Sequence, residues 1–294
     1  MKRITQEIIS ILKFSISKND NSYKFFKEFL EIYKIIQIIQ NSNKQNLKAR
    51  ILFIDLFSWN GLISFLLQKF YPNSHIIPID IQEIWSLKEK NIFWRNLKNY
   101  FWDKDYNIIS KKLRNNYKNI DILNNFNLLI SFIIDRFNNW DFDKIILIGN
   151  HGCKQLSVNF IKLVNILSEI YPNKVNFIIQ PCCEDTYEKS EEIKLIPDNI
   201  KISAFNISNL FSFLSMKDII SIFLEKKGNY LLWKKWTNKY LDKVSYNKIL
   251  INQKWLISYH DWVEHLANLL NKDIRINTKW SVGLTYKNLI FYKM

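Results

Sequence analysis

The segment from Ile51 to Leu62, ILFIDLFSWNGL, joins a run of apolar residues to an acid, a turn and the start of an amphipathic stretch. A short apolar run that ends in Asp55, followed by a helical pattern over 61–70, predicts a buried strand, a turn and a helix. Comparable apolar runs occur at 75–79, 144–148 and 175–179, with amphipathic stretches between them. Buried runs of this length that alternate with helices predict a parallel sheet covered on both faces.

The rest of the chain extends this prediction. Further helices are expected at 83–116, 124–138, 157–170, 208–225 and 259–271. A weaker strand is expected at 119–123, and the chain closes with two strands, 274–280 and 284–292, joined through Ser281 to Gly283. The predicted fold class is therefore α/β. It has a Rossmann-like, seven-stranded, mostly parallel sheet with an antiparallel C-terminal strand, in one domain over 46–294.

Residues 1–45 are predicted to form a helical extension to this domain. Apolar residues such as Ile8, Leu12, Phe29 and Ile36 recur at a spacing of three to four, with Lys and Glu between them. The stripe that they form can pack on the chain's own domain. It can equally bind a protein partner or a second copy of the chain, and the sequence leaves both uses open.

The composition excludes several classes of protein. The 294 residues are 48% hydrophobic and 15% aromatic, which is enough apolar surface for a folded core. Three Cys exclude a disulfide framework and favour a reducing compartment. No uncharged apolar run is long enough to span a membrane, and charged residues interrupt the first apolar stretch, unlike a signal peptide. We expect a protein of the cytoplasm or of an organelle interior, not a secreted one.

The chain carries a formal net charge of +15. Lys, Asn, Ile, Phe and Tyr are all abundant, as in proteins from AT-rich genomes, so part of this charge reflects codon bias. A field of this size still favours polyanions, and RNA is the expected partner. Residues 229–255 interleave Lys with Trp and Tyr, which predicts either an RNA surface or an amphipathic element whose aromatic side chains face the core.

The ends of the first two strands carry the first candidate site residues. Asp55 follows one strand and Asp80 follows the next, and ligands of open α/β sheets bind beyond these carboxyl ends. An acid at the end of the second strand is placed to bind two ribose hydroxyls. Gly61 is the only glycine of the first turn, so the glycine-rich fingerprint of hydride-transferring dinucleotide enzymes is missing.

Four motifs resemble those of one protein family. Asp55 to Ser64, DLFSWNGLIS, resembles the D-x-G-x-G-x-G-x-L-S turn of class I S-adenosylmethionine-dependent methyltransferases. Asp80 and Asp121 match the acids that follow the second and third strands of that family. Asn150 to Leu156, NHGCKQL, resembles an L-H-x-C-G-x-L segment, and Gln180 to Cys183, QPCC, resembles a P-C-C segment. This pair occurs in proteins related to the methyltransferase-like 25 group and to tRNA acceptor-stem ribose methyltransferases.

The resemblance implies a methyltransferase that uses S-adenosylmethionine and acts on RNA, as in tRNA processing or on rRNA. It implies cofactor contacts from the first turn, from the following acids and from Asn150, namely Asp55, Phe57, Ser58, Trp59, Gly61, Asp80, Asp121 and Asn150. The catalytic candidates on the acceptor side are His151, Cys182 and Cys183. His151 is the candidate base, because an imidazole titrates near neutral pH.

The departures from the family pattern support a second interpretation. Phe57 and Trp59 replace two glycines that let the backbone approach the cofactor, and Lys154 replaces the glycine that follows the cysteine of the L-H-x-C-G-x-L segment. An inactive relative retained for RNA binding or ribosome assembly is the alternative function. In an enzyme we expect Trp59 to point away from an open cleft. In an inactive relative Trp59 or Phe57 should lie across it, in contact with residues near 149–151.

Simpler roles remain possible for the same residues. Asp55 could cap the following helix, Asp80 could be a solvated carboxylate, and the three cysteines could serve packing alone. A zinc site from these cysteines and His151 is disfavoured. Adjacent side chains such as Cys182 and Cys183 point to opposite faces of a strand, and no Cys-x-x-Cys occurs. We therefore expect no metal.

Overall fold

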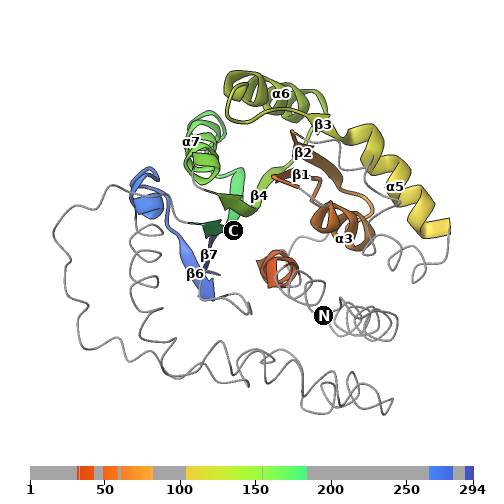
Figure 1. Cartoon of the computed structure of the whole chain (residues 1–294), viewed down its shortest axis with the longest axis horizontal. Helices are drawn as coiled ribbons and strands as arrows, with labels where there is room; N and C mark the ends of the chain where they lie inside the picture. The colour runs from red at the N-terminus through yellow and green to blue at the C-terminus, as the bar shows by residue number, and fades with distance from the viewer. Residues whose placement is uncertain are drawn as a thin grey trace, which may run out of the picture.

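The computed structural model describes residue 32 and residues 34–42, 49–58, 61–81, 104–153, 155–183, 265–280 and 289–294. Within them, strands and helices alternate from β1 to β5, and two further strands follow near the C-terminus (Figure 1). The predicted helix over 208–225 and the lysine- and aromatic-rich stretch 229–255 lie outside the described residues, as do most of the extension and residues 82–103. In the part described, no helix is long and apolar enough to cross a membrane.

The strands form one mixed sheet in the order β3-β2-β1-β4-β5-β7-β6. Their bounds are Ile51–Leu56 (β1), His75–Asp80 (β2), Lys118–Asn119 (β3), Lys144–Cys153 (β4), Val175–Cys183 (β5), Asn277–Trp280 (β6) and Leu289–Lys293 (β7). Neighbours from β3 to β5 are parallel, whereas β7 runs antiparallel to both β5 and β6. The predicted α/β class and the mostly parallel sheet with its antiparallel C-terminal strand are confirmed.

One strand prediction is largely wrong. The strand expected at 119–123 is reduced to the two residues of β3, so the seventh strand of the predicted sheet is only a short edge. Residues 121–124 form a turn instead, because the Asp121 carboxylate accepts hydrogen bonds from the backbone N–H groups of Leu123 and Asn124. Such local bonding by Asp competes with a strand ladder.

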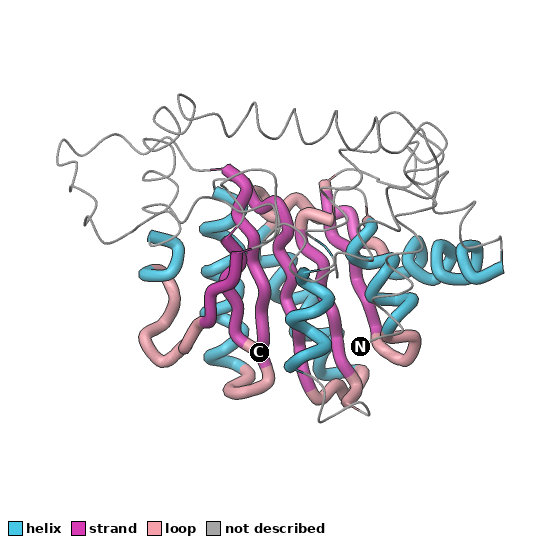
Figure 2. The backbone as a smooth tube through the Cα atoms, turned by 90° about the horizontal axis from the view of Figure 1, so that it is seen from below, coloured by secondary structure: helices cyan, strands magenta, loops and turns pink. Residues whose placement is uncertain are grey.

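Four helices connect the parallel strands. They are α3 (Leu62–Phe70), α5 (Lys104–Asn116), α6 (Phe126–Asn139) and α7 (Gln155–Ile170). In Figure 1, α6 and α7 lie on one side of the sheet and α3 lies on the other. Seen at right angles, the strands run side by side with helices before and behind them (Figure 2). The connection from β1 and the connection from β4 therefore leave the sheet on opposite faces.

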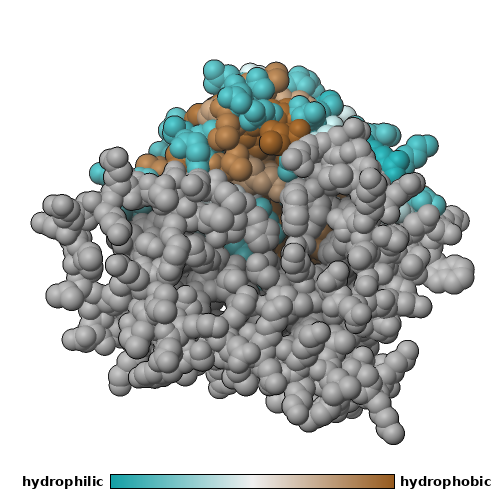
Figure 3. Space-filling model, viewed as in Figure 1, coloured by the Kyte–Doolittle hydropathy of each residue, from teal (hydrophilic) through white to brown (hydrophobic). Residues whose placement is uncertain are grey.

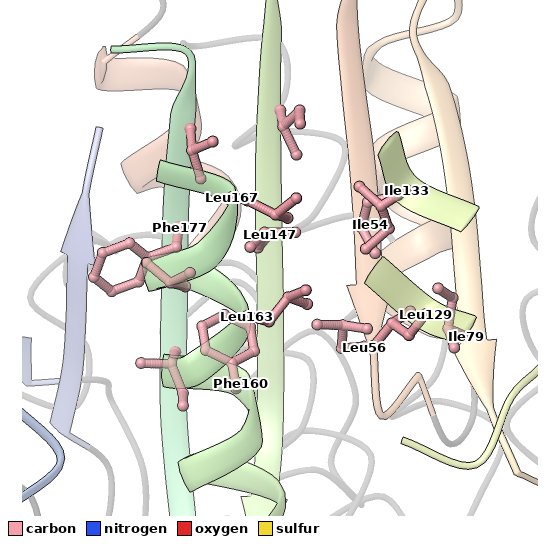
Figure 4. Packing of buried hydrophobic residues seen from close by; sticks show 14 of the residues in the cluster. Ile54, Leu56, Ile79, Leu129, Ile133, Leu147, Phe160, Leu163, Leu167 and Phe177 are labelled. Atoms are coloured by element: carbon pink, nitrogen blue, oxygen red, sulfur yellow. The ribbon is translucent and has the colours of Figure 1, made fainter. Parts of the chain in front are cut away.

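The core beneath α6 and α7 explains why these helices form where they do. Each carries apolar residues at helical spacing, among them Leu129 and Ile133 on α6 and Leu163 and Leu167 on α7, and all four are completely buried. Figure 4 shows them against side chains from alternate positions of the strands, such as Leu147. Burying aliphatic side chains like these stabilises the fold by about 1.5–3 kcal/mol each.

Part of the predicted N-terminal extension is helical and packed. Residue 32 and residues 34–42 have helical backbone, and in Figure 1 they lie on the α3 side of the sheet. The isoleucines of this segment are at most 3% exposed, namely Ile32, Ile35, Ile36, Ile38 and Ile39. This part of the apolar stripe is therefore buried within the chain itself. The proposed domain boundary at 45 stays a prediction.

Candidate functional site

The candidate site lies where the strand order reverses. β1 has β2 on one side and β4 on the other, and the helices that follow β1 and β4 cover opposite faces. Connections that diverge in this way leave room for a ligand beyond the carboxyl ends of the strands. Asp55, near the end of β1, has Pro78 of β2 and Ile148 of β4 as its neighbours in register.

Asp55 is a buried acid with one short hydrogen bond. Its side chain is 1% exposed, and the Ser64 hydroxyl on α3 donates to Asp55 Oδ2 at 2.6 Å. The pKa of Asp55 is raised to about 7, chiefly by burial and also by the nearby charge of Asp80, against the lowering effect of the Ser64 hydrogen bonds. The simple role of helix cap stays a prediction for Asp55, because the backbone N–H of Ser64, in the first turn of α3, also lowers its pKa.

The turn between β1 and α3 is fixed by backbone hydrogen bonds. The N–H of Ser58 donates to the Ile79 carbonyl at 3.3 Å, and the N–H of Gly61 donates to the Ser58 carbonyl. Gly61 has φ 65°, a left-handed conformation that glycine adopts without a steric penalty. Ser58 is only 6% exposed, and its Oγ makes no hydrogen bond with the described residues.

Phe57 also has a left-handed backbone, with φ 61°. This conformation costs a non-glycine residue roughly 1–2 kcal/mol. The ring of Phe57 lies 6.4 Å from the ring of Phe160, centroid to centroid. Its Cε2 is 3.4 Å from the position that a Cβ on Gly149 would take and 3.0 Å from that of Gly152.

Phe57 thus makes the contact near 149–151 that the sequence analysis assigned to an inactive relative. The ring, however, packs against the core under α7. Asp55 bonds to α3, on the other face of the sheet. The aromatic ring is therefore not placed between Asp55 and α3. Trp59, the other residue of this test, lies outside the described residues.

Asp80 and Asp121 differ in their surroundings. Asp80 is half-buried at the end of β2, and its backbone carbonyl accepts a hydrogen bond from the Tyr117 hydroxyl at 3.0 Å. Asp121 lies in the turn before α6, where both carboxylate oxygens accept hydrogen bonds from residues 123 and 124. The Asn124 side chain, foremost among these donors, lowers the pKa of Asp121. This acid already has a local structural role.

The two motifs of the acceptor side meet as neighbouring strands. Asn150 on β4 pairs in register with Gln180 on β5, and Cys153 pairs with Cys183 across an irregular part of the ladder. Asn150 is 8% exposed, and its Oδ1 accepts no hydrogen bond from the described residues. The backbone of the candidates His151, Cys182 and Cys183 therefore lies at the same end of the sheet as Asp55. Among the residues the structure describes, no three metal-ligating side chains form a group.

Sequence reasoning missed three residues of this region. Ser64 is the last residue of the quoted DLFSWNGLIS motif. The motif therefore included this residue, but it did not predict the hydrogen bond from Ser64 to Asp55. Gly149 and Gly152 provide the space that the rings of Phe57 and Phe160 occupy. Nothing in the sequence shows which ring fills the space above a glycine on a distant strand.

Known proteins give little further guidance. No protein family matches the sequence, and no curated protein is similar to it. Among solved structures, a variant of MtNAS in complex with S-adenosylmethionine is 11% identical with a TM-score of 0.27, over 60% of this chain and 56% of that one. The plantazolicin methyltransferase BpumL in complex with SAH is 13% identical with a TM-score of 0.33, over 99% of this chain and 96% of that one. The chain thus spans just over half the length of MtNAS.

Proposed function

We propose that the protein is an S-adenosylmethionine-dependent methyltransferase that acts on RNA. The observation that carries this proposal is the placement of Asp55, Asp80 and the left-handed Gly61 at the reversal point of the sheet. This is where ligands of such sheets bind, and an acid at the end of the second strand suits a ribose. The four motifs that resemble class I methyltransferases supply the reaction class.

The residues present fit such a cofactor. Ser58 Oγ and Asn150 Oδ1 are buried polar atoms without a partner in the described part of the chain, and buried groups of this kind require a hydrogen bond from a ligand or from water. The charge of Asp80 raises the pKa of Asp55, and two neighbouring acids favour a positively charged ligand over an anion. The cofactor supplies a methyl group on a positively charged sulfur.

The chain's own residues would bind and orient the two reactants. Asp80 would accept hydrogen bonds from the ribose hydroxyls, and the turn from Asp55 to Gly61 would hold the methionine end. Asn150, with the strand ends that carry His151 and Cys183, would face the acceptor. Methyl transfer depends chiefly on holding the acceptor in line with the methyl group, and a hydroxyl acceptor also needs a base, for which His151 is the candidate. The net charge of +15 favours RNA as the acceptor.

Calorimetric titration of the full chain with S-adenosylmethionine tests this function. We expect the native protein to bind, and Asp80→Asn to bind about tenfold or more weakly, since hydrogen bonds to a charged group contribute about 1.5–3 kcal/mol. Asp273→Asn removes the same charge from an exposed acid on the loop before β6 and should bind as the native protein does.

The alternative outcomes are distinct. A native protein that binds no cofactor at millimolar concentration excludes the enzyme and leaves the inactive, RNA-binding relative. Equal losses in Asp80→Asn and Asp273→Asn would show that the loss reflects net charge, and would remove Asp80 from the site.

A further inference from the structure

A line of cationic and aromatic side chains runs from β3 over the second half of α6 to the residue before β1. Neighbouring members lie 5.4 to 6.4 Å apart, measured to ring centroids. We call it the basic–aromatic row, and its members in order are Lys118, Phe132, Arg136, Trp140, Phe142 and Arg50. Figure 3 shows hydrophilic and apolar side chains side by side over the region of α6.

The row extends from the carboxyl ends of the parallel strands, where the candidate site lies, to their amino-terminal ends. It begins at Lys118 on β3, which pairs with Ile79, the residue before Asp80. It ends at Arg50, directly before β1, whose Nη2 donates to the Trp140 carbonyl at 2.6 Å. Because β1 has six residues at about 3.3 Å each, the two ends of the strands are separated by about 20 Å.

Trp140 is the exposed ring of the row. It is 43% exposed at the C-terminal end of α6, with the Arg136 guanidinium 5.6 Å from its ring centroid. The ring of His75 supports it at 4.6 Å. Burial, and then the charges of Lys112 and Arg136, lower the pKa of His75 to about 4, so this support is neutral at pH 7 and adds no charge.

The charges along the row are mostly uncompensated. Arg50 forms a salt bridge of 3.3 Å with the exposed Asp141. Arg136 and Lys118 instead lie over the Phe132 ring and form no salt bridge with any carboxylate in the described part of the chain. Two cations without carboxylate partners and one exposed indole match the phosphates and the bases of a single nucleic-acid strand.

We propose that the basic–aromatic row binds a single-stranded segment of RNA that leads from the candidate site, with a base stacked on Trp140 and phosphates on Arg136 and Lys118. The proposal deepens the proposed function, because it states where the acceptor RNA lies next to the site. It also requires an RNA longer than a mononucleotide, because the row extends about 20 Å from the site.

Fluorescence anisotropy with a labelled 12-nucleotide single-stranded RNA tests the row in the full chain without cofactor. We expect Trp140→Leu, which keeps apolar bulk but has no aromatic face, to weaken binding about tenfold, as is typical for loss of one stacked base. Arg136→Gln should weaken binding and reduce the slope of log affinity against log salt by about 0.7. Lys162→Gln removes one charge from an exposed position on α7 and serves as the matched control.

The results separate this proposal from the methyltransferase itself. Three results would each overturn the row as an RNA site. The first is native affinity in both Trp140→Leu and Arg136→Gln, and the second is a native protein that does not bind the probe. The third is equal binding of the same RNA as a duplex. None of these results changes the cofactor titration. Circular dichroism and the thermal midpoint of each variant show whether it folds. If Trp140→Leu does not fold, Arg136→Gln decides.

Discussion

Asp55 has a pKa near neutrality in the folded chain, because it is buried beside a second acid. The ordinary value is 3.8 and the folded value about 7, so between these pH values the folded state holds a proton that the unfolded state has released. Stability therefore falls as pH rises from about 4 to about 7, and the loss is complete above the folded value.

Asp55→Asn should remove this pH dependence. The free energy of unfolding of the native chain should fall relative to that of the variant by a few kcal/mol between pH 4 and 8, at about 1.4 kcal/mol for each unit of pKa shift. Urea unfolding at a series of pH values measures the free energy of unfolding of the native chain and of the variant. Ser64→Ala, which removes the donor that lowers the pKa, should move the end of the decline to higher pH. Parallel curves for the native chain and Asp55→Asn would contradict the buried acid.

For single site residues, the sequence predicted the place in the fold better than the hydrogen-bond partners. Asp55 and Asp80 lie near the ends of β1 and β2, and Gly61 lies directly before α3, where the motif placed them. Asp121 was predicted to face the cofactor, but its oxygens bond to the turn at 123 and 124. A spacing rule identifies which acid follows a strand. It does not reveal that nearby backbone N–H groups and an asparagine compete for that acid.

At the scale of elements, Phe57 connects the β1–α3 turn to β4. Gly152→Ala would place a Cβ 3.0 Å from Phe57 Cε2 and 3.1 Å from Ser157 Oγ, so both neighbours must move. We expect this overpacking to cost about 1–3 kcal/mol. In a Phe57→Ala background the same change should cost less, with a coupling of about 0.5 kcal/mol or more in a double-mutant cycle from urea unfolding. Strict additivity would show that Phe57 does not occupy this space.

The long, strongly apolar elements were the most predictable. β1, β2, β4 and β5 contain the predicted runs because a strand buried on both faces is continuously apolar, and α6 and α7 begin within two residues of their predicted starts. β3 was misplaced because Ile120 and Ile122 alternate with polar residues as a strand would. Both are buried, yet Ile120 lies in the loop after β3 and Ile122 in the turn that follows.

At the scale of the molecule, the segment with Ile32 and residues 34–42 is part of the fold. Ile36→Ala should lower the free energy of unfolding by about 2–5 kcal/mol, because Ile36 is completely buried. Asn41→Ala, an exposed position of the same helical segment, should change it little. Urea unfolding measures the stability, and light scattering measures the molar mass. If Ile36→Ala leaves the stability unchanged but alters the molar mass, this segment binds a partner or a second copy of the chain instead of stabilising the fold.

The basic–aromatic row could not be predicted from the sequence. Arg50 lies 68 positions before Lys118, which lies 18 positions before Arg136. Only the packing of α6 over β1 to β3 places the three side chains in one line. The sequence instead identified 229–255, where cations and aromatic residues are adjacent in the chain. Local composition detects a contiguous pattern, whereas a surface built from several elements depends on the fold.

The position of β7 joins a distant part of the chain to the parallel strands. Its strand inserts between β5 and β6, and its pairing of Ile178 with Tyr292 joins residues more than one hundred positions apart. Closing a loop of that length carries an entropic penalty of about 4 kcal/mol, which must be met before the pairing contributes stability. β1 pairs with β2, β2 with β3 and β4 with β5 over 23 to 39 positions, whereas β1 and β4 pair across 93. In any state of the chain in which β7 has not docked, the edge of β5 that it covers is open to intermolecular strand pairing.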